Sequence, residues 1–297
     1  MAERRVLVTG ASGVLGWHLC RLLDSDRTLT VWGTCKQNRP AFERIECHTL
    51  DLEEFPGRAN ERWAGFFDII VHTAAWTNPD ECDRDPVRAN RVNVEATGRL
   101  IDWLRPGGRF IYTSTDLVFD GAVGGYSESD TPNPVNHYGE TKLEAEKIVR
   151  RLPGGVVVRI AKLYSNGSPF HPCFVTWMKE KLDRGETVPL FRDQFRTPLF
   201  IGDAVGGLRL LFDREPKQGL YHLGGPERLN RYEFGRRYAE CGGYPLDRLE
   251  AIAMRDVGLV ARGADCSLDS SRFVGEFSWA RTDLEQGLRK LRGDLTN

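Results

Sequence analysis

The sequence predicts an α/β fold in which helices cover both faces of a doubly wound parallel sheet, with a smaller second lobe. In the first half of the chain, short apolar runs rich in β-branched residues alternate with amphipathic stretches of helical length. A glycine-rich turn separates the first apolar run from the first helical stretch. After residue 160 the alternation breaks into pieces punctuated by proline and glycine, which predicts the second lobe.

The apolar periodicity predicts the individual elements. Strands are expected at 5–9, 29–33, 45–50, 68–73, 109–114 and 156–160. Helices are expected at 13–23, 88–104 and 138–151, and in the second half at 174–183 and 231–240. With 297 residues, the chain is long enough for one large domain or two unequal lobes that pack together.

Composition excludes several function classes. The 41 basic and 42 acidic residues give a formal net charge of -1, which supplies no broad positive field for nucleic acid. The seven cysteines are scattered without metal-ligand spacing, so we expect reduced thiols, no metal site and a cytoplasmic location. The first apolar run is too short for a signal peptide or a membrane span, so no membrane partner is expected.

A glycine-rich segment follows the first predicted strand and opens the first predicted helix. Its residues are Thr9-Gly10-Ala11-Ser12-Gly13-Val14-Leu15-Gly16. Glycine lets the backbone turn tightly and approach a pyrophosphate, and the helix N-terminus then favours the anion. We therefore predict a dinucleotide site whose phosphate-binding residues are Gly10, Ser12, Gly13, Val14, Leu15 and Gly16.

The segment after the second strand bears on the choice of cofactor. It lacks the acidic residue that would hold an NAD ribose, and it offers Lys36 and Arg39 where a 2′-phosphate could sit, next to Cys35. NADP is therefore favoured and NAD remains open, although two cations on a solvated loop would look the same in the sequence. Further cofactor contacts are expected at the ends of strands three and four, at Asp51, Leu52, Thr73, Ala74 and Ala75.

A second group of residues predicts carbonyl chemistry. Tyr138 and Lys142 lie one helical turn apart, so their side chains share a face. A lysine ammonium and an oxidised nicotinamide ring together lower the pKa of a tyrosine phenol. Because strand five ends in Ser114-Thr115-Asp116, Thr115 could hold the oxyanion of a ketone while the cofactor delivers hydride and Tyr138 a proton.

These residues resemble the extended short-chain dehydrogenase/reductase family over nearly the whole chain. The most specific likeness is to the dTDP-4-dehydrorhamnose reductases, in Ser114-Thr115-Asp116-Leu117-Val118-Phe119-Asp120-Gly121, in Tyr126-x-Glu128-x-Asp130-x-Pro132-x-Pro134 and in Tyr138-Gly139-Glu140-Thr141-Lys142. The segments 193–198 and 265–269 are similar more loosely. The resemblance implies that Thr115 rather than Ser114 is the catalytic hydroxyl and that Lys142 orients the nicotinamide ribose.

The resemblance also implies a sugar nucleotide bound between the lobes. In the wider family an arginine near Arg196 contacts the diphosphate, and an ion pair of Arg196 with Asp193 or Asp203 is the alternative. We expect Thr115, Asp116 and Arg196 to contact substrate. The chain departs from the close reductases at Arg196, where they carry glycine. Its turn after strand two is more similar to the regulatory β subunit of methionine adenosyltransferase, a relative that works by binding a partner.

Together these observations predict an NADPH-dependent reductase of a nucleotide-linked 4-keto-6-deoxy sugar, acting on a small-molecule substrate. Residues 1–160 would form a Rossmann dinucleotide-binding domain, with segments near 186–224 returning to it, and residues 161–297 would mostly form the substrate-binding lobe. Two alternatives stay open. One is a non-catalytic NADP-binding regulatory subunit. The other is an epimerase or dehydratase, for which Asp116 could supply the additional acid or base. A homodimer is also left open, as are the sugar, the nucleotide and the direction of reaction.

Overall fold

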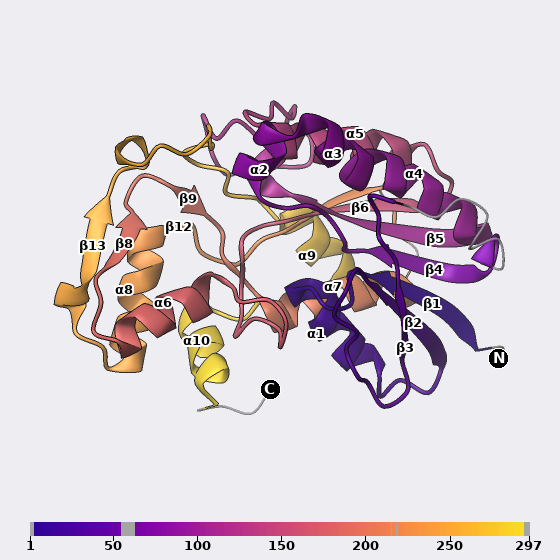
Figure 1. Cartoon of the computed structure of the whole chain (residues 1–297), viewed down its shortest axis with the longest axis horizontal. Coiled ribbons are helices and arrows are strands. Elements are labelled where there is room, and N and C mark those ends of the chain that lie inside the picture. Colours follow the sequence, from indigo (N-terminus) through magenta and orange to yellow (C-terminus); the bar gives the residue numbers. More distant parts are fainter. Residues whose placement is uncertain (1–2, 55–62, 215, 218, 294–297) are drawn as a thin grey trace.

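A computed structural model describes residues 3–54, 63–214, 216–217 and 219–293 of the chain. Its main feature is a seven-stranded parallel sheet with the strand order β11-β6-β5-β4-β1-β2-β3 (Figure 1). The strands are β1 (Arg4–Thr9), β2 (Leu29–Cys35), β3 (Glu46–Thr49), β4 (Phe67–His72), β5 (Leu104–Thr115), β6 (Gly155–Ile160) and β11 (Leu220–Leu223). The strand order reverses between β1 and β4, the point at which such sheets bind ligands. This arrangement confirms the predicted doubly wound fold.

Helices cover both faces of the sheet (Figure 1). One face carries α2 (Pro79–Arg84), α3 (Pro86–Asn90), a π-helical turn (Arg91–Glu95), α4 (Ala96–Leu100), a 3₁₀ turn (Ile101–Trp103) and α5 (His137–Arg150). The other face carries α1 (Val14–Leu23), α7 (Ile201–Asp213) and α9 (Ser271–Phe277). Strand β4 is buried along its whole length, as expected for a strand covered on both faces.

The second lobe lies beside the sheet (Figure 1). It is built from short strand pairs and three helices, namely β7 (Leu163–Tyr164) with β10 (Leu199–Phe200), β8 (Val188–Phe191) with β13 (Leu249–Ile252), β9 (Phe195–Arg196) with β12 (Leu229–Asn230), α6 (Phe174–Asp183), α8 (Arg231–Gly242) and α10 (Leu284–Arg292). Three 3₁₀ turns complete the described elements, at Asp116–Val118, Leu246–Arg248 and Met254–Asp256. The lobe shares a continuous apolar core with the sheet face that carries α1 and α7.

One element prediction, the single helix at 88–104, needs correction. The stretch predicted as one helix at 88–104 begins at Pro86, passes through the π-helical turn and ends in the 3₁₀ turn, and Leu104 already belongs to β5. The π-helical turn contains Asn93, whose buried side chain binds both main-chain groups of Trp76 (2.8 and 3.1 Å). In the range 186–224, α7 and β11 pack with the sheet, whereas β8 pairs with β13 outside it.

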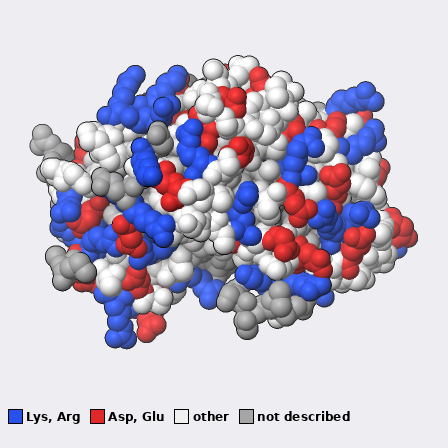
Figure 2. Space-filling model, turned by 180° about the vertical axis from the view of Figure 1, so that it is seen from behind, with Lys and Arg blue, Asp and Glu red and all other residues white. Residues whose placement is uncertain are grey.

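The surface carries both signs of charge. On the face seen in Figure 2, lysine and arginine side chains are interspersed with aspartate and glutamate side chains. In the described part of the chain, no helix is both long enough and apolar enough to cross a membrane. All seven cysteines are free thiols.

Candidate active site

A cleft of about 700 Å³ opens at the carboxyl ends of the central strands. Its floor comes from the turns after β1, β2, β3, β4, β5 and β6, and the segment 171–174, which leads into α6, forms another wall. The predicted cofactor positions that line it are Gly10, Ser12, Gly13, Val14, Leu15, Gly16, Cys35, Lys36, Asp51, Leu52, Thr73, Ala74, Ala75, Tyr138 and Lys142. The topology thus brings residues from six strand ends to one site.

The glycine turn lies closely against its neighbours. Gly10 has a φ of 71°, and a Cβ added there would lie 2.9 Å from the backbone of Ala74. A Cβ on Gly16 would lie 2.2 Å from the carbonyl oxygen of Gly10. Gly13 caps α1 without a side-chain acceptor, so no cap occupies the first amides of that helix. This geometry fits a pyrophosphate, because both the backbone approach and the helix N-terminus face the cleft.

The two cations predicted to bind the 2′-phosphate, Lys36 and Arg39, differ in where their side chains lie. Lys36 lines the cleft and pairs with Asp51 (2.9 Å) and Glu53 (3.5 Å). Arg39 donates to the hydroxyl of Thr49 from two nitrogens (3.0 and 2.9 Å) and is not among the described residues that line the cleft. Only Lys36 therefore faces the cofactor region directly.

Thr115 and Tyr138 meet at the inner end of the cleft. Asn136 caps α5 by accepting from the amide of Gly139 (2.9 Å). A Cβ on Gly139 would lie 2.3 Å from the carbonyl oxygen of Leu117, so glycine allows the start of α5 to approach the turn after β5. As a result, the phenol of Tyr138 lies beside the hydroxyl of Thr115, which itself donates to the carboxylate of Asp116 (3.1 Å).

The pKa of Tyr138 is raised in the protein without cofactor. Burial and, next, the Asp116 carboxylate raise the pKa of this phenol above its ordinary value, while the neighbouring Thr115 hydroxyl acts in the opposite direction. The predicted lowering of this pKa refers to the complex with an oxidised cofactor and stays a prediction. The shift keeps the phenol protonated at neutral pH, which is the state a proton donor requires.

Lys142 lies one turn further along α5 and is buried, with its ammonium nitrogen 4.2 Å from the ring centre of Tyr112. Burial lowers the pKa of Lys142 to about 7, and the carboxylate of Glu146 opposes the shift. Glu146 accepts a hydrogen bond from Ser114 (2.5 Å) and pairs with the buried Arg159 (2.7 Å). Of the two hydroxyl groups at the end of β5, Ser114 is thus engaged in the core and Thr115 reaches Tyr138.

Asp116 and Arg196 form a buried ion pair between the lobes. The Nε of Arg196 lies 3.1 Å from the Oδ2 of Asp116, and its two terminal nitrogens donate to the carbonyl oxygen of Gly263 (3.1 Å each). The alternative partners of Arg196 are wrong, because Asp193 accepts from the amide of Met254 and Asp203 binds Thr282. Burial raises the pKa of Asp116, and Arg196 counteracts that shift.

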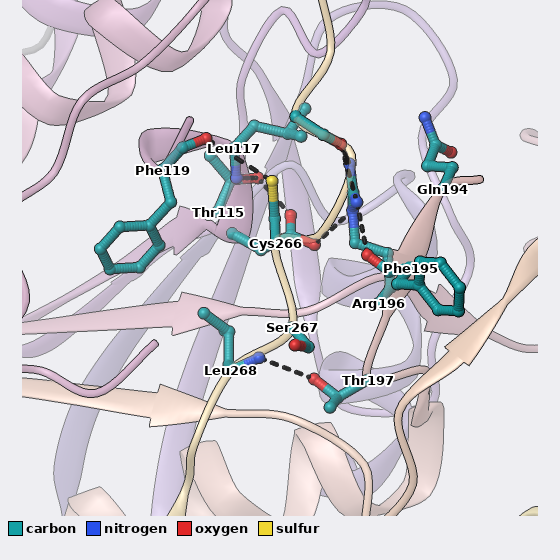
Figure 3. Close-up of polar contacts among 12 residues, drawn as sticks. Thr115, Leu117, Phe119, Gln194, Phe195, Arg196, Thr197, Cys266, Ser267 and Leu268 are labelled. Carbon is teal, nitrogen blue, oxygen red and sulfur yellow. Dashed lines mark hydrogen bonds and ion pairs between the residues drawn. The ribbon is translucent and has the colours of Figure 1, made fainter. Parts of the chain in front are cut away.

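The segment Cys266–Leu268, near the C-terminus, passes beside Thr115 and Arg196 (Figure 3). The amide of Leu268 donates to Thr197 (3.2 Å), beyond β9, and the thiol of Cys266 donates to the carbonyl oxygen of Phe119 (3.5 Å), beyond β5. This segment therefore joins the second lobe to the turn after the strand that carries Thr115.

Sequence reasoning missed several residues that line the cleft. Lys162 follows β6 at the carboxyl edge of the sheet, so its position after a predicted strand was the signal that could have identified it. Arg88, which pairs with Glu53 (3.0 Å), and Phe174 reach the cleft from helices, and nothing in the sequence pattern marks them. Among the described residues, no group of three histidine, cysteine or acidic side chains could hold a metal ion.

Comparison with known proteins supplies the family. The model of the RmlD substrate binding domain matches residues 4–296. Methionine adenosyltransferase 2 subunit beta of Mus musculus is 31% identical over 96% of this chain and 87% of its own length. The probable low-salt glycan biosynthesis reductase Agl14 of Haloferax volcanii is 31% identical over 98% of each chain.

Solved structures agree with the fold. A hypothetical dTDP-4-dehydrorhamnose reductase from Sulfolobus tokodaii superimposes with a TM-score of 0.80 at 29% identity, over 95% of this chain and 98% of that one. The dTDP-4-dehydrorhamnose reductase of Bacillus anthracis in complex with NADP gives 0.78 at 22% identity, over 99% and 100%. Since the family model spans nearly all of the sequence, this chain belongs to the RmlD substrate binding domain family, within the extended short-chain dehydrogenase/reductases.

Proposed function

We propose that the protein is an NADPH-dependent reductase of a nucleotide-linked 4-keto-6-deoxy sugar. The observation that carries the proposal is the position of the Tyr138 phenol beside the Thr115 hydroxyl in a cleft floored by a glycine turn, with Lys142 one helical turn away from Tyr138. A hydroxyl donor, a protonated phenol and a lysine beside a dinucleotide site are the groups that reduction of a ketone requires.

Each side chain has a distinct role in this proposal. A bound nicotinamide supplies the hydride. Thr115 donates a hydrogen bond to the carbonyl oxygen, which gains negative charge as the ketone is reduced. Tyr138 gives its proton to that oxygen, so hydride and proton together convert the ketone to an alcohol. Lys142 binds the ribose hydroxyls and supplies the charge that stabilises Tyr138 after the proton has left.

The assignments of cofactor and substrate rest on separate grounds. Lys36 at the rim of the cleft favours the 2′-phosphate of NADP. The nucleotide sugar is supported by the relatives whose names describe reductases, namely the Sulfolobus tokodaii protein and Agl14. Asp116 is committed to Arg196, which makes it a poor additional acid or base and disfavours an epimerase or dehydratase.

The test is turnover with a substrate panel. Purified protein mixed with NADPH and dTDP-, UDP- and GDP-linked 4-keto-6-deoxy sugars should lose the absorbance of the reduced cofactor with at least one of them. NADPH binding without turnover of any sugar in the panel would contradict the proposed reaction.

A second candidate is a cofactor-binding subunit that regulates a partner enzyme. The observation that favours it is the similarity to methionine adenosyltransferase 2 subunit beta of Mus musculus and of Bos taurus, at 31% and 32% identity over almost the whole chain. Affinity purification from the native source distinguishes the two candidates. A stoichiometric partner enzyme whose rate changes on binding, together with no turnover of the panel, would favour the subunit.

A further inference from the structure

Beside the cleft lies a small pocket that is strongly positive. The described residues that line it include Lys162, Arg196 and Arg231, and none of them is acidic. Aromatic rings and amides complete the lining, with Phe174, Phe234, Gln194 and Asn230. Lys162 and Phe174 line both this pocket and the cleft, so the pocket continues the cleft away from the glycine turn.

The three cations are not equivalent. Arg196 is committed to the Asp116 carboxylate and to the carbonyl oxygen of Gly263. Arg231 donates to the amide oxygen of Gln194 (2.5 Å) and lies over the ring of Phe174 (5.1 Å), with no carboxylate partner among the described residues. Two positive charges are therefore left without a counter-charge in this part of the site.

Lys162 is the most available of these cations. Its side chain is exposed in the cleft and forms no ion pair or hydrogen bond with any residue that the structure describes. Ile160 is the register partner of Thr115, so Lys162 lies just beyond the catalytic hydroxyl on the neighbouring strand.

The charge and the size of the site indicate the ligand group. The site has three positive side chains, and the Asp116 carboxylate neutralises one of them, so that two positive charges remain. The diphosphate of a nucleotide sugar carries two negative charges. The pocket encloses only about 20 Å³, close to the space that one water needs, so an anion this large would lie at its mouth, beside Lys162.

We propose that Lys162 and Arg231 bind the substrate diphosphate, and that Arg196 holds Asp116 rather than the substrate. This assignment rests on the proposed function, because it concerns the substrate of the same site. It makes Lys162 the residue that selects phosphorylated over unphosphorylated sugars, since an unpaired ammonium in the cleft attracts an anion and gives no such attraction to a neutral group.

Binding rather than turnover tests this proposal. The protein loaded with NADP⁺ is titrated in a calorimeter with dTDP, UDP, thymidine and uridine. The wild-type protein should bind at least one diphosphate tenfold or more tightly than its nucleoside. Lys162→Met should weaken that diphosphate about tenfold without changing nucleoside or NADP⁺ binding, because one charged hydrogen bond is lost.

Lys179→Met is the matched control, because Lys179 is an exposed lysine of α6 paired with Asp183. It should bind the diphosphate like the wild-type protein. Equal diphosphate affinity in the folded Lys162→Met protein would overturn the proposal. Failure of the wild-type protein to bind either diphosphate would also overturn it. The sugar acid D-glucuronate is titrated as well. If only D-glucuronate bound in a way that depends on Lys162, the proposal would be overturned, because Lys162 would then recognise a carboxylate and not a diphosphate. Binding that depends on Lys162, without turnover of any keto sugar, would uphold this subsite and refute the reductase.

Discussion

Lys36 illustrates how one side chain can set cofactor preference. It lies at the rim of the cleft, half exposed, and its ammonium pairs with Asp51 and Glu53. The hydrogen bond to Asp51 is the main cause of the raised pKa of Lys36. An incoming 2′-phosphate would meet this ammonium together with Arg88, which also pairs with Glu53. The proposed preference for NADPH would therefore depend on exchanging the partly buried carboxylates of Asp51 and Glu53 for a phosphate.

Replacing Lys36 by methionine should weaken NADPH about tenfold and leave NADH binding nearly unchanged, because only NADPH presents the 2′-phosphate. Arg39→Met removes the same charge from a side chain bound to Thr49, and should change NADPH affinity much less. Both affinities can be followed by the fluorescence of the reduced cofactor. Equal affinities for NADPH in the wild-type and Lys36→Met proteins would contradict the role of Lys36.

The sequence predicts types of residue better than it predicts side-chain directions. Lys36 and Arg39 are equivalent candidates in the sequence, and the structure separates them because one turns to the cleft and the other to Thr49. The resemblance implies that Arg196 contacts the substrate diphosphate. Its ion pair with Asp116 could not be predicted, because the two residues lie 80 positions apart and no local sequence pattern encodes such a contact. Lys162 could have been found, because it directly follows a predicted strand.

At the scale of elements, His72 joins β4 to its neighbours. Its Nδ1 hydrogen-bonds to the hydroxyl of Thr9 in β1 (2.7 Å), and its Nε2 to that of Thr97 in α4 (3.1 Å). The Thr97 hydroxyl donates to a carbonyl oxygen, so it accepts from Nε2. Nδ1 is then an acceptor. This pattern requires a neutral imidazole, which agrees with the lowering of its pKa to about 3 by burial.

The pH dependence of stability follows from this shift. Above about pH 6.5 the imidazole is neutral in both the folded and the unfolded chain. Between pH 6.5 and 3 only the unfolded chain takes up the proton, so the free energy of unfolding should fall by about 1.4 kcal/mol per pH unit from this residue. The stabilisation is present above 6.5 and is lost as the pH falls.

Nuclear magnetic resonance of histidine-labelled protein can test this behaviour. The His72 ring, assigned by the signal missing in His72→Asn, should keep its neutral chemical shift from pH 7.5 to 5. The same ring in the urea-unfolded chain should titrate across that range. A His72 signal that titrates near pH 6.5 in the folded protein would refute the neutral, bonded imidazole.

Long periodic elements were predicted most reliably. Helix α6 (Phe174–Asp183) lies where its apolar spacing placed it, and the glycine turn opens α1 as expected. The stretch 88–104 failed as one helix because a buried Asn93 binds the main chain of Trp76. Strand β11 was not predicted, because a strand of four residues is too short to show a hydrophobic period. Its partner β6 also lies far away along the chain, so no local pattern indicates the pairing.

At the scale of the whole molecule, the site lies where two lobes meet. The larger lobe supplies Thr115 from β5 and Tyr138 and Lys142 from α5, and the second lobe supplies the pocket with Arg231. The Asp116–Arg196 ion pair joins the two lobes. The segment 266–268 contacts residues of both (Figure 3). A long substrate with its ketone at Tyr138 and its anion at Lys162 would span this junction.

The most direct test of this account is single-turnover reduction of the sugar that the panel identifies, by the wild-type and Tyr138→Phe proteins with NADPH bound. Tyr244→Phe, which removes a hydroxyl bound to Asp183 in the second lobe, serves as the control. Tyr138→Phe should slow hydride transfer at least a hundredfold with NADPH affinity unchanged, while Tyr244→Phe keeps the wild-type rate. A Tyr138→Phe protein that reduces the sugar at the wild-type rate would contradict the assignment of Tyr138 as the proton donor.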